Sequence, residues 1–169
     1  MNRTFVAIAP ILLLVALPAR AGIGDKALPL LSGQKTKLLY TLNGVSDTAQ
    51  MATVIYCTNT APSGGNAVRV GIEVFNFAGN QMNNTAGGQG TANVLPGTTW
   101  TFVTKAATAF PLDIQILPSA APFTNGASAR IFATGKTIVC SALLVDKTGN
   151  PPESMATLPI FSTLKQKGQ

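Results

Sequence analysis

The sequence predicts an all-β fold: a single-domain antiparallel β-sandwich, immunoglobulin-like in its general architecture, that follows a signal peptide. Three observations favour this fold. No amphipathic helix can be traced after residue 21. Stretches rich in Val, Ile, Thr and aromatic residues recur, and clusters of Gly, Pro, Asn and Ser separate them. About nine short strands joined by such turns are typical of two antiparallel sheets packed face to face.

The amino-terminal segment, residues 1–21, has the composition of a secretory signal peptide. Arg3 supplies a positive charge, residues 5–17 form an apolar run, and Ala19 and Ala21 give the A-x-A pattern of a cleavage site. The run is too short for a membrane span, which takes about 20 helical residues. We therefore expect cleavage after Ala21, no stable membrane insertion afterwards, and a secreted or periplasmic protein.

The strands are predicted from their residue types and their alternation. In the clearest of them the even-numbered positions are aliphatic, whereas Arg69, Gly71 and Glu73 face the other way. This alternation predicts a strand with one buried face. The predicted strands span residues 36–42, 50–58, 68–77, 91–95, 98–104, 112–117, 129–134, 137–145 and 155–163.

The connections between these strands differ in length. Residues 22–34 are expected to be a loosely held lead-in, and residues 35–169 form the predicted domain. Pro96 and Gly97 predict a tight hairpin turn, and Gly135 begins a similar short link. The longer connections span residues 78–90, 118–126 and 146–153.

Two cysteines, Cys57 and Cys140, lie on the second and the penultimate predicted strands. In an exported protein this pair predicts one disulfide, which stabilises the fold by about 4.5 kcal/mol in the chain-entropy model. In immunoglobulin-like sandwiches a bridge between such strands pins the two sheets together. The alternative is two buried free thiols. Trp100 lies further from Cys57 than the immunoglobulin pattern requires, and no motif identifies a named family.

The absence of histidine is the observation that most restricts function. It excludes Ser-His-Asp and Cys-His hydrolases, cupredoxin copper sites and histidine-containing zinc sites, and no cofactor is expected. Without the predicted signal peptide, which contains Arg3 and Arg20, the net charge is +4. Because these charges are scattered, we expect no nucleic-acid partner.

Carboxylate side chains are candidates for two kinds of site, a catalytic pair and a calcium site. Glu73 and Asp113 lie on predicted strands and are the candidate pair for glycosidase chemistry, which needs two carboxyl groups about 5–10 Å apart. The alternative is that both face solvent. Asp146, Asn150 and Glu153 share one loop and are candidate ligands for calcium. The alternative for these three is a turn whose polar side chains face water.

Two surfaces are candidates for binding a sugar or a peptide. Trp100 and Phe102 share one strand face and would form an aromatic platform, although core packing is the favoured explanation. Asn80, Asn83 and Asn84 lie in the long Gly/Asn-rich connection. Long loops on a rigid scaffold often carry recognition sites. The alternative is that this connection is a flexible loop with no binding role.

The function predicted from these features is that of an exported, non-catalytic protein acting through its surface. Its role would be structural or binding, in the periplasm, the cell envelope or the extracellular space. The partner is unknown; an envelope component or a second copy of the chain is expected. Self-association is expected because the sequence has few charged residues that would prevent strand edges from pairing with another chain. The alternatives are a carboxylate-dependent enzyme acting on polysaccharide and a small-ligand or calcium-binding module.

Overall fold

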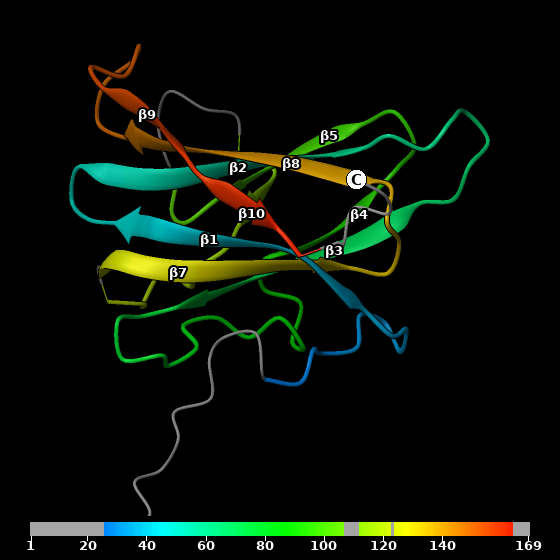
Figure 1. Cartoon of the computed structure of the whole chain (residues 1–169). Helices are drawn as coiled ribbons and strands as arrows, with labels where there is room; N and C mark the ends of the chain where they lie inside the picture. The colour runs from blue at the N-terminus through cyan, green and yellow to red at the C-terminus, as the bar shows by residue number, and fades with distance from the viewer. Residues whose placement is uncertain (1–25, 107–111, 123, 164–169) are drawn as a thin grey trace, which may run out of the picture.

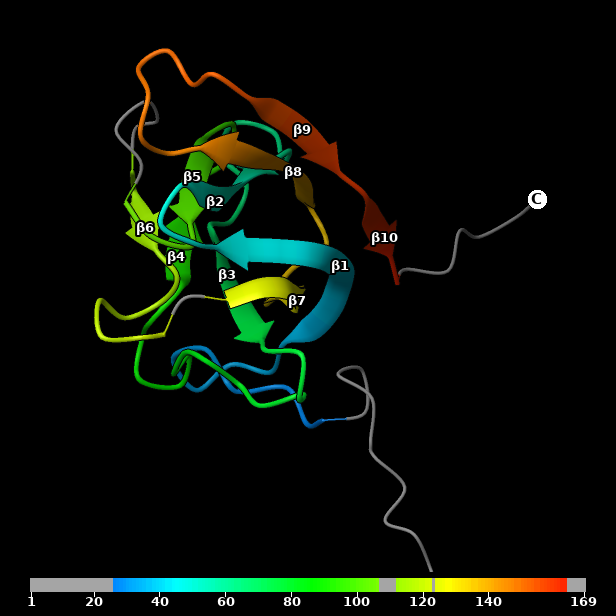
Figure 2. The same cartoon turned by 90° about the vertical axis from the view of Figure 1, so that its left-hand side faces the viewer.

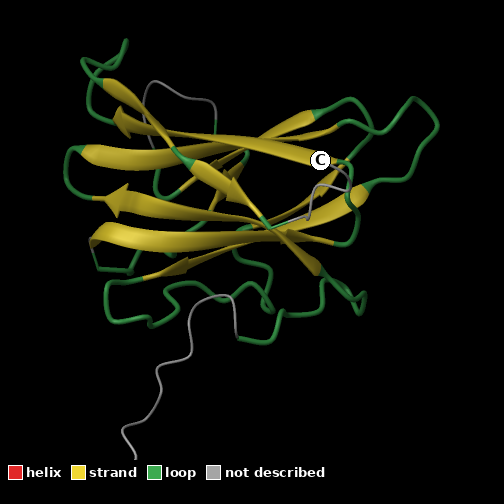
Figure 3. Ribbon diagram, viewed as in Figure 1, coloured by secondary structure: helices red, strands yellow, loops and turns green. Residues whose placement is uncertain are grey.

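The computed structural model describes residues 26–106, 112–122 and 124–163. The regular structure of these residues is all strand, which confirms the predicted all-β class (Figure 3). The predicted signal peptide, residues 1–21, lies outside the described residues. Within those residues, no helix is long and apolar enough to span a membrane.

Each predicted strand has a counterpart, but several ends differ. Over the described residues the strands are β1 (Lys37–Asp47), β2 (Met51–Asn59), β3 (Val68–Phe75), β4 (Thr91–Val94), β5 (Thr99–Val103), β6 (Ile114–Gln115), β7 (Thr124–Ala133), β8 (Ile138–Asp146), β9 (Met155–Leu158) and β10 (Ile160–Ser162). The last predicted strand is divided in two at Pro159, because proline has no N–H for a ladder hydrogen bond. β7 begins inside the predicted 118–126 connection.

Hydrogen bonding joins the described strands into one nearly barrel-shaped sheet with two facing halves (Figures 1 and 2). The first half has the order β4-β3-β7-β1, and the second has the order β6-β5-β2-β8-β9. The halves meet where Asp47 of β1 pairs with Ala52 of β2, and the β9–β10 ribbon passes from β8 to β1. The predicted antiparallel pairing is confirmed except between β5 and β6, which are parallel.

The two short turns connect the halves, so the predicted hairpin is wrong. Pro96 and Gly97 do form a tight turn, in which Thr98 N–H donates to Leu95 O at 3.1 Å and Gly97 has a φ of 73°. However, β4 pairs with β3 while β5 pairs with β2. The link at Gly135 likewise leads from the first half to the second. Turn residues determine the local reversal of the chain but not the partner of the strand that follows.

The Cys57–Cys140 disulfide is present, as predicted. It joins residues that face each other directly on β2 and β8, with Cα atoms 4.2 Å apart. Because these strands are neighbours in the second half, the expectation that the bridge pins two sheets together is wrong. The immunoglobulin-like arrangement is therefore not confirmed.

From Gly71 onward β3 is buried on both of its faces, which corrects the prediction of one buried face for this strand. Val70, Ile72 and Val74 face the main core between the halves. On the outer face, Gly71 lies opposite Phe132 of β7, and the Phe132 ring is fully buried. A Cβ added at Gly71 would come within 2.5 Å of this ring, so glycine is needed for the ring to pack against the strand.

Candidate functional site

The loop that follows β3 holds Phe77 out from the surface. The Asn76 side-chain oxygen accepts the backbone N–H groups of Ala78 and Asn80 at 3.0 and 2.9 Å. Gly79 completes this turn with a φ of 77°. Phe77 was predicted to lie in the strand, but β3 ends two residues earlier and the Phe77 ring is 90% exposed.

A hollow of about 380 Å³ lies beside the Phe77 ring. Because β3 and β7 are antiparallel, the residues after the end of β3 lie next to the residues at the start of β7. Ser46 Oγ of β1 donates to Asn125 Oδ1 at 3.4 Å, which helps to orient that amide. The lining consists of uncharged side chains: Asn76, Phe77, Met82, Pro122, Thr124 and Asn125.

The three asparagines predicted as binding candidates have different positions. Asn83 is buried: its Oδ1 accepts Val74 N–H at 3.0 Å, and its Nδ2 donates to Ile72 O at 2.8 Å. The Asn83 amide therefore takes the place of a neighbouring strand at the edge of β3. Asn80 and Asn84 are exposed and make turn contacts within their own loop.

A buried ion pair lies on the outer face of the first half. Arg130 Nε of β7 and Glu73 Oε2 of β3 are 2.5 Å apart, and the two residues are 1% and 2% exposed. Glu73 Oε1 accepts hydrogen bonds from Thr85 Oγ1 at 2.8 Å and Gln81 Nε2 at 3.1 Å. This carboxylate is thus satisfied by groups from β7 and from the 76–90 loop.

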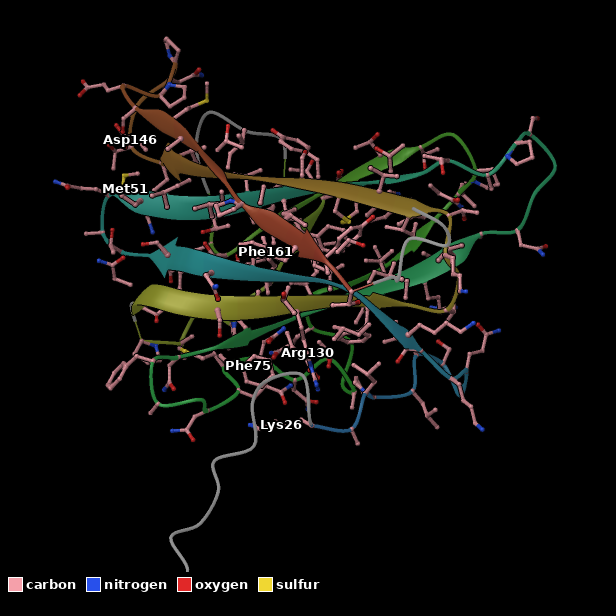
Figure 4. The ribbon with its side chains drawn as sticks, viewed as in Figure 1. Lys26, Met51, Phe75, Arg130, Asp146 and Phe161 are labelled. Carbon is pink, nitrogen blue, oxygen red and sulfur yellow. A yellow bond between two sulfur atoms is a disulfide. The ribbon has the colours of Figure 1, made fainter. Side chains whose placement is uncertain are left out.

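The amino-terminal segment covers the same ion pair (Figure 4). Arg130 donates to the backbone oxygens of Lys26 and Ala27 at 2.7 and 3.1 Å. Lys26 Nζ donates to Gly79 O at 2.9 Å and lies 4.9 Å from the centre of the Phe75 ring. The described part of the expected loose lead-in is therefore tied to β7 and to the loop that carries Phe77.

The candidate carboxylate pair is not brought together in one site. Glu73 Oε2 binds Arg130 under the covering loop, so Glu73 is not the solvent-facing residue that was the alternative. Asp113 is exposed next to β6, and its Oδ2 accepts Thr101 N–H at 2.7 Å. A general acid or base must reach the substrate, and a carboxylate with 2% exposure and both oxygens engaged does not.

Trp100 and Phe102 pack into the main core. Phe102 is fully buried, and Trp100 packs against the core cluster while remaining half-buried. Both lie on β5, whose neighbour β2 carries Cys57 opposite Trp100. These side chains therefore do not form an exposed aromatic platform.

Asp146 and Glu153 line one hollow of about 390 Å³, whereas Asn150 is exposed outside its lining. Asp146 Oδ1 accepts the Thr148 N–H at 2.8 Å and the Thr148 hydroxyl at 2.7 Å. The Thr148 backbone N–H, followed by its hydroxyl, lowers the pKa of Asp146 below the ordinary value of 3.8. No group of three or more Cys, Asp or Glu residues suited to a metal occurs among the described residues. Calcium binding in this loop stays a prediction.

A second buried carboxylate, Asp47, lies where the ends of β1, β5 and β8 meet. Lys105 Nζ is 3.1 Å from its Oδ2, and Lys147 Nζ is 3.0 Å from its Oδ1. Lys105 also donates to Ala121 O at 2.8 Å. These contacts hold three strand ends together.

No protein-family model, curated protein or solved structure matches the chain. Phe77 was predicted to lie in a strand, and no role was predicted for Asn125. Asn76 could have indicated that the strand ends before Phe77, because asparagine favours turns.

Proposed function

We propose that this protein is exported and acts as a non-catalytic binding protein of the cell envelope, through the hollow beside Phe77. The observation that carries the proposal is the 90% exposed Phe77 ring, held on a loop fixed by Asn76 and Asn83. A ring exposed in this way contributes little to the core, and its apolar faces are suited to contact a partner.

Export is supported by the disulfide and by the composition of residues 1–21. Disulfides form and persist in oxidising compartments such as the periplasm. A non-catalytic role is supported by the absence of histidine and by the full engagement of Glu73. A β-sandwich remains the proposed finer description of the fold, because the two halves of the sheet pack on one core.

The test is photo-crosslinking in the native cells, with p-benzoylphenylalanine in place of Phe77. The matched control carries the same group in place of Phe161, which lies on β10 and is 53% exposed (Figure 4). We expect a discrete adduct with an envelope component from position 77 and none, or a different one, from position 161. No adduct at either position, or the same adducts at both, would contradict the proposal. Mass spectrometry of the exported protein would locate its first residue, expected at Gly22.

A further inference from the structure

We propose that the ligand of the hollow beside Phe77 is a neutral saccharide, whose ring stacks on Phe77 and whose hydroxyls bind the amides and the hydroxyl of the lining. This inference rests on the proposed function, because it names the chemistry of the partner that the hollow binds. Four properties of the site carry it: its lack of charge, its exposed ring, its closed strand edges and its fixed loop.

Among the described residues, no charged side chain lines the hollow. A charged ligand would lose hydration on entering the hollow and gain no opposite charge from the lining in return. The nearby Lys26 ammonium already donates to Gly79 O and lies against the Phe75 ring. The site therefore favours a ligand that is polar but neutral.

The lining combines an aromatic ring and apolar side chains with hydrogen-bonding groups. Phe77, Met82 and Pro122 provide apolar surface, and Asn125 and Thr124 carry polar atoms. A pyranose has the matching surfaces: a face of C–H groups that packs on an aromatic ring, and hydroxyls around its rim that both donate and accept. The volume of about 380 Å³ lies within the roughly 300–1,000 Å³ that ligand sites usually have.

The strands beside the hollow have no free edge that could pair with a peptide. Asn83 occupies the Val74 N–H and the Ile72 O of β3, and β7 is paired with β3 and β1. Extended peptides gain much of their affinity by adding a strand to an open edge. That mode of binding is blocked here.

The surroundings of Phe77 also disfavour insertion into a membrane. Asn76 and the exposed Asn125 line the hollow with Phe77, and the exposed Asn80 lies in the same turn as Phe77. Insertion of the ring into lipid would bring these amides out of water, which costs free energy for each unpaired polar group. Saccharide hydroxyls, in contrast, can satisfy the same amides.

The loop is already ordered by its own hydrogen bonds. Asn76 holds the turn, and Met82 N–H donates to Val74 O at 2.8 Å. Lys26 and Gln81 attach the loop to the amino-terminal segment and to Glu73. A preordered loop loses little conformational freedom on binding, which helps a weakly interacting ligand such as a sugar.

The test is binding of the purified exported protein to an oligosaccharide array, followed by calorimetry. The probes are tetrasaccharides of glucose, mannose, galactose and N-acetylglucosamine, with a tetrasaccharide of galacturonic acid as the charged probe. We expect at least one neutral probe to bind and the charged probe not to bind. Phe77→Ala should weaken binding about tenfold or more, Phe77→Trp should retain it, and Phe161→Ala should leave it unchanged.

Three results would overturn the inference: no neutral probe binds at millimolar concentration, the charged probe alone binds, or Phe77→Ala binds as the unmodified protein does. The crosslinking experiment separates this inference from the proposed function. An adduct at position 77 in which mass spectrometry finds peptides of a second protein crosslinked to this chain would preserve a binding role and reject the saccharide. Loss of both the adduct and the array signal would reject both proposals.

Discussion

The two halves of the sheet each contain a directly opposed cross-strand pair, and the two pairs differ in chemistry and in orientation. Cys57 and Cys140 form a covalent bridge within the second half that faces the main core between the halves. Glu73 and Arg130 form an ion pair on the outer face of the first half. A cystine facing the core needs no hydrogen-bond partner, whereas a buried ion pair needs partners for its remaining donors and acceptors.

The surroundings of the two pairs differ in the same way. The 76–90 loop and the amino-terminal segment supply the remaining partners of Glu73 and Arg130, and they cover the outer face of the first half in doing so. The outer face of the second half is buried only in part: Val54, Val103 and Val145 are fully buried there, whereas Val139 and Met155 remain 55% and 60% exposed. The buried charge nearest to it, Asp47, lies at the strand ends and is paired with Lys105 and Lys147. The exposed Phe77 ring is thus carried by a loop that the buried charges hold in place.

The largest expected effect comes from breaking the ion pair. Arg130→Met leaves the Glu73 carboxylate buried without its cation, and we expect a loss of about 3–5 kcal/mol in the free energy of unfolding. Denaturant unfolding measures this loss. The double variant Arg130→Met/Glu73→Leu is the control and should recover most of the stability, because no charge stays buried. A single variant as stable as the unmodified protein would show that the covering segments do not depend on the ion pair.

Removal of the disulfide should have a somewhat smaller effect on the stability of the whole fold, with the largest local loosening in the second half. For Cys57→Ala/Cys140→Ala we expect a loss of about 2–4 kcal/mol, because the unfolded chain gains freedom. Thermal unfolding with and without a reductant is the measurement. Reductant should lower the midpoint of the unmodified protein and leave that of the variant unchanged. Hydrogen exchange should increase on β2 and β8 more than on β3 and β7; equal increases in both halves would contradict the comparison.

The smallest expected effect concerns Asp146, a carboxylate of the second half that its own loop stabilises. Hydrogen bonds from Thr148 lower its pKa in the folded protein, so its ionised form stabilises the fold above the ordinary pKa of 3.8. That contribution is lost as the pH falls from 3.8 through the folded-state pKa. The stability difference between the unmodified protein and Asp146→Asn should therefore shrink over this range in urea unfolding. A difference that stays constant with pH would show that this carboxylate is not held in the folded state.

Much of the local structure could be predicted from the sequence. The alternation of residues 68–74, the turn at Pro96 and the disulfide are all present. Such features depend on residues close together in the chain or, for the cysteines, on the only available partner. Gly71 was placed on the outer face, as the structure has it, but the ring that packs on it comes from Phe132, and no local pattern indicated that contact.

By itself the sequence determined that this chain folds from short strands and lacks the imidazole that many enzymes need, and it favoured one cystine over two free thiols. The tertiary structure alone decided which strands are neighbours, and therefore that the disulfide lies within one half. It also decided that Glu73 is buried, since its partner Arg130 lies 57 residues further along the chain. Strand alternation acts over a few residues, but burial and charge pairing depend on segments that meet only when the two halves close around their core.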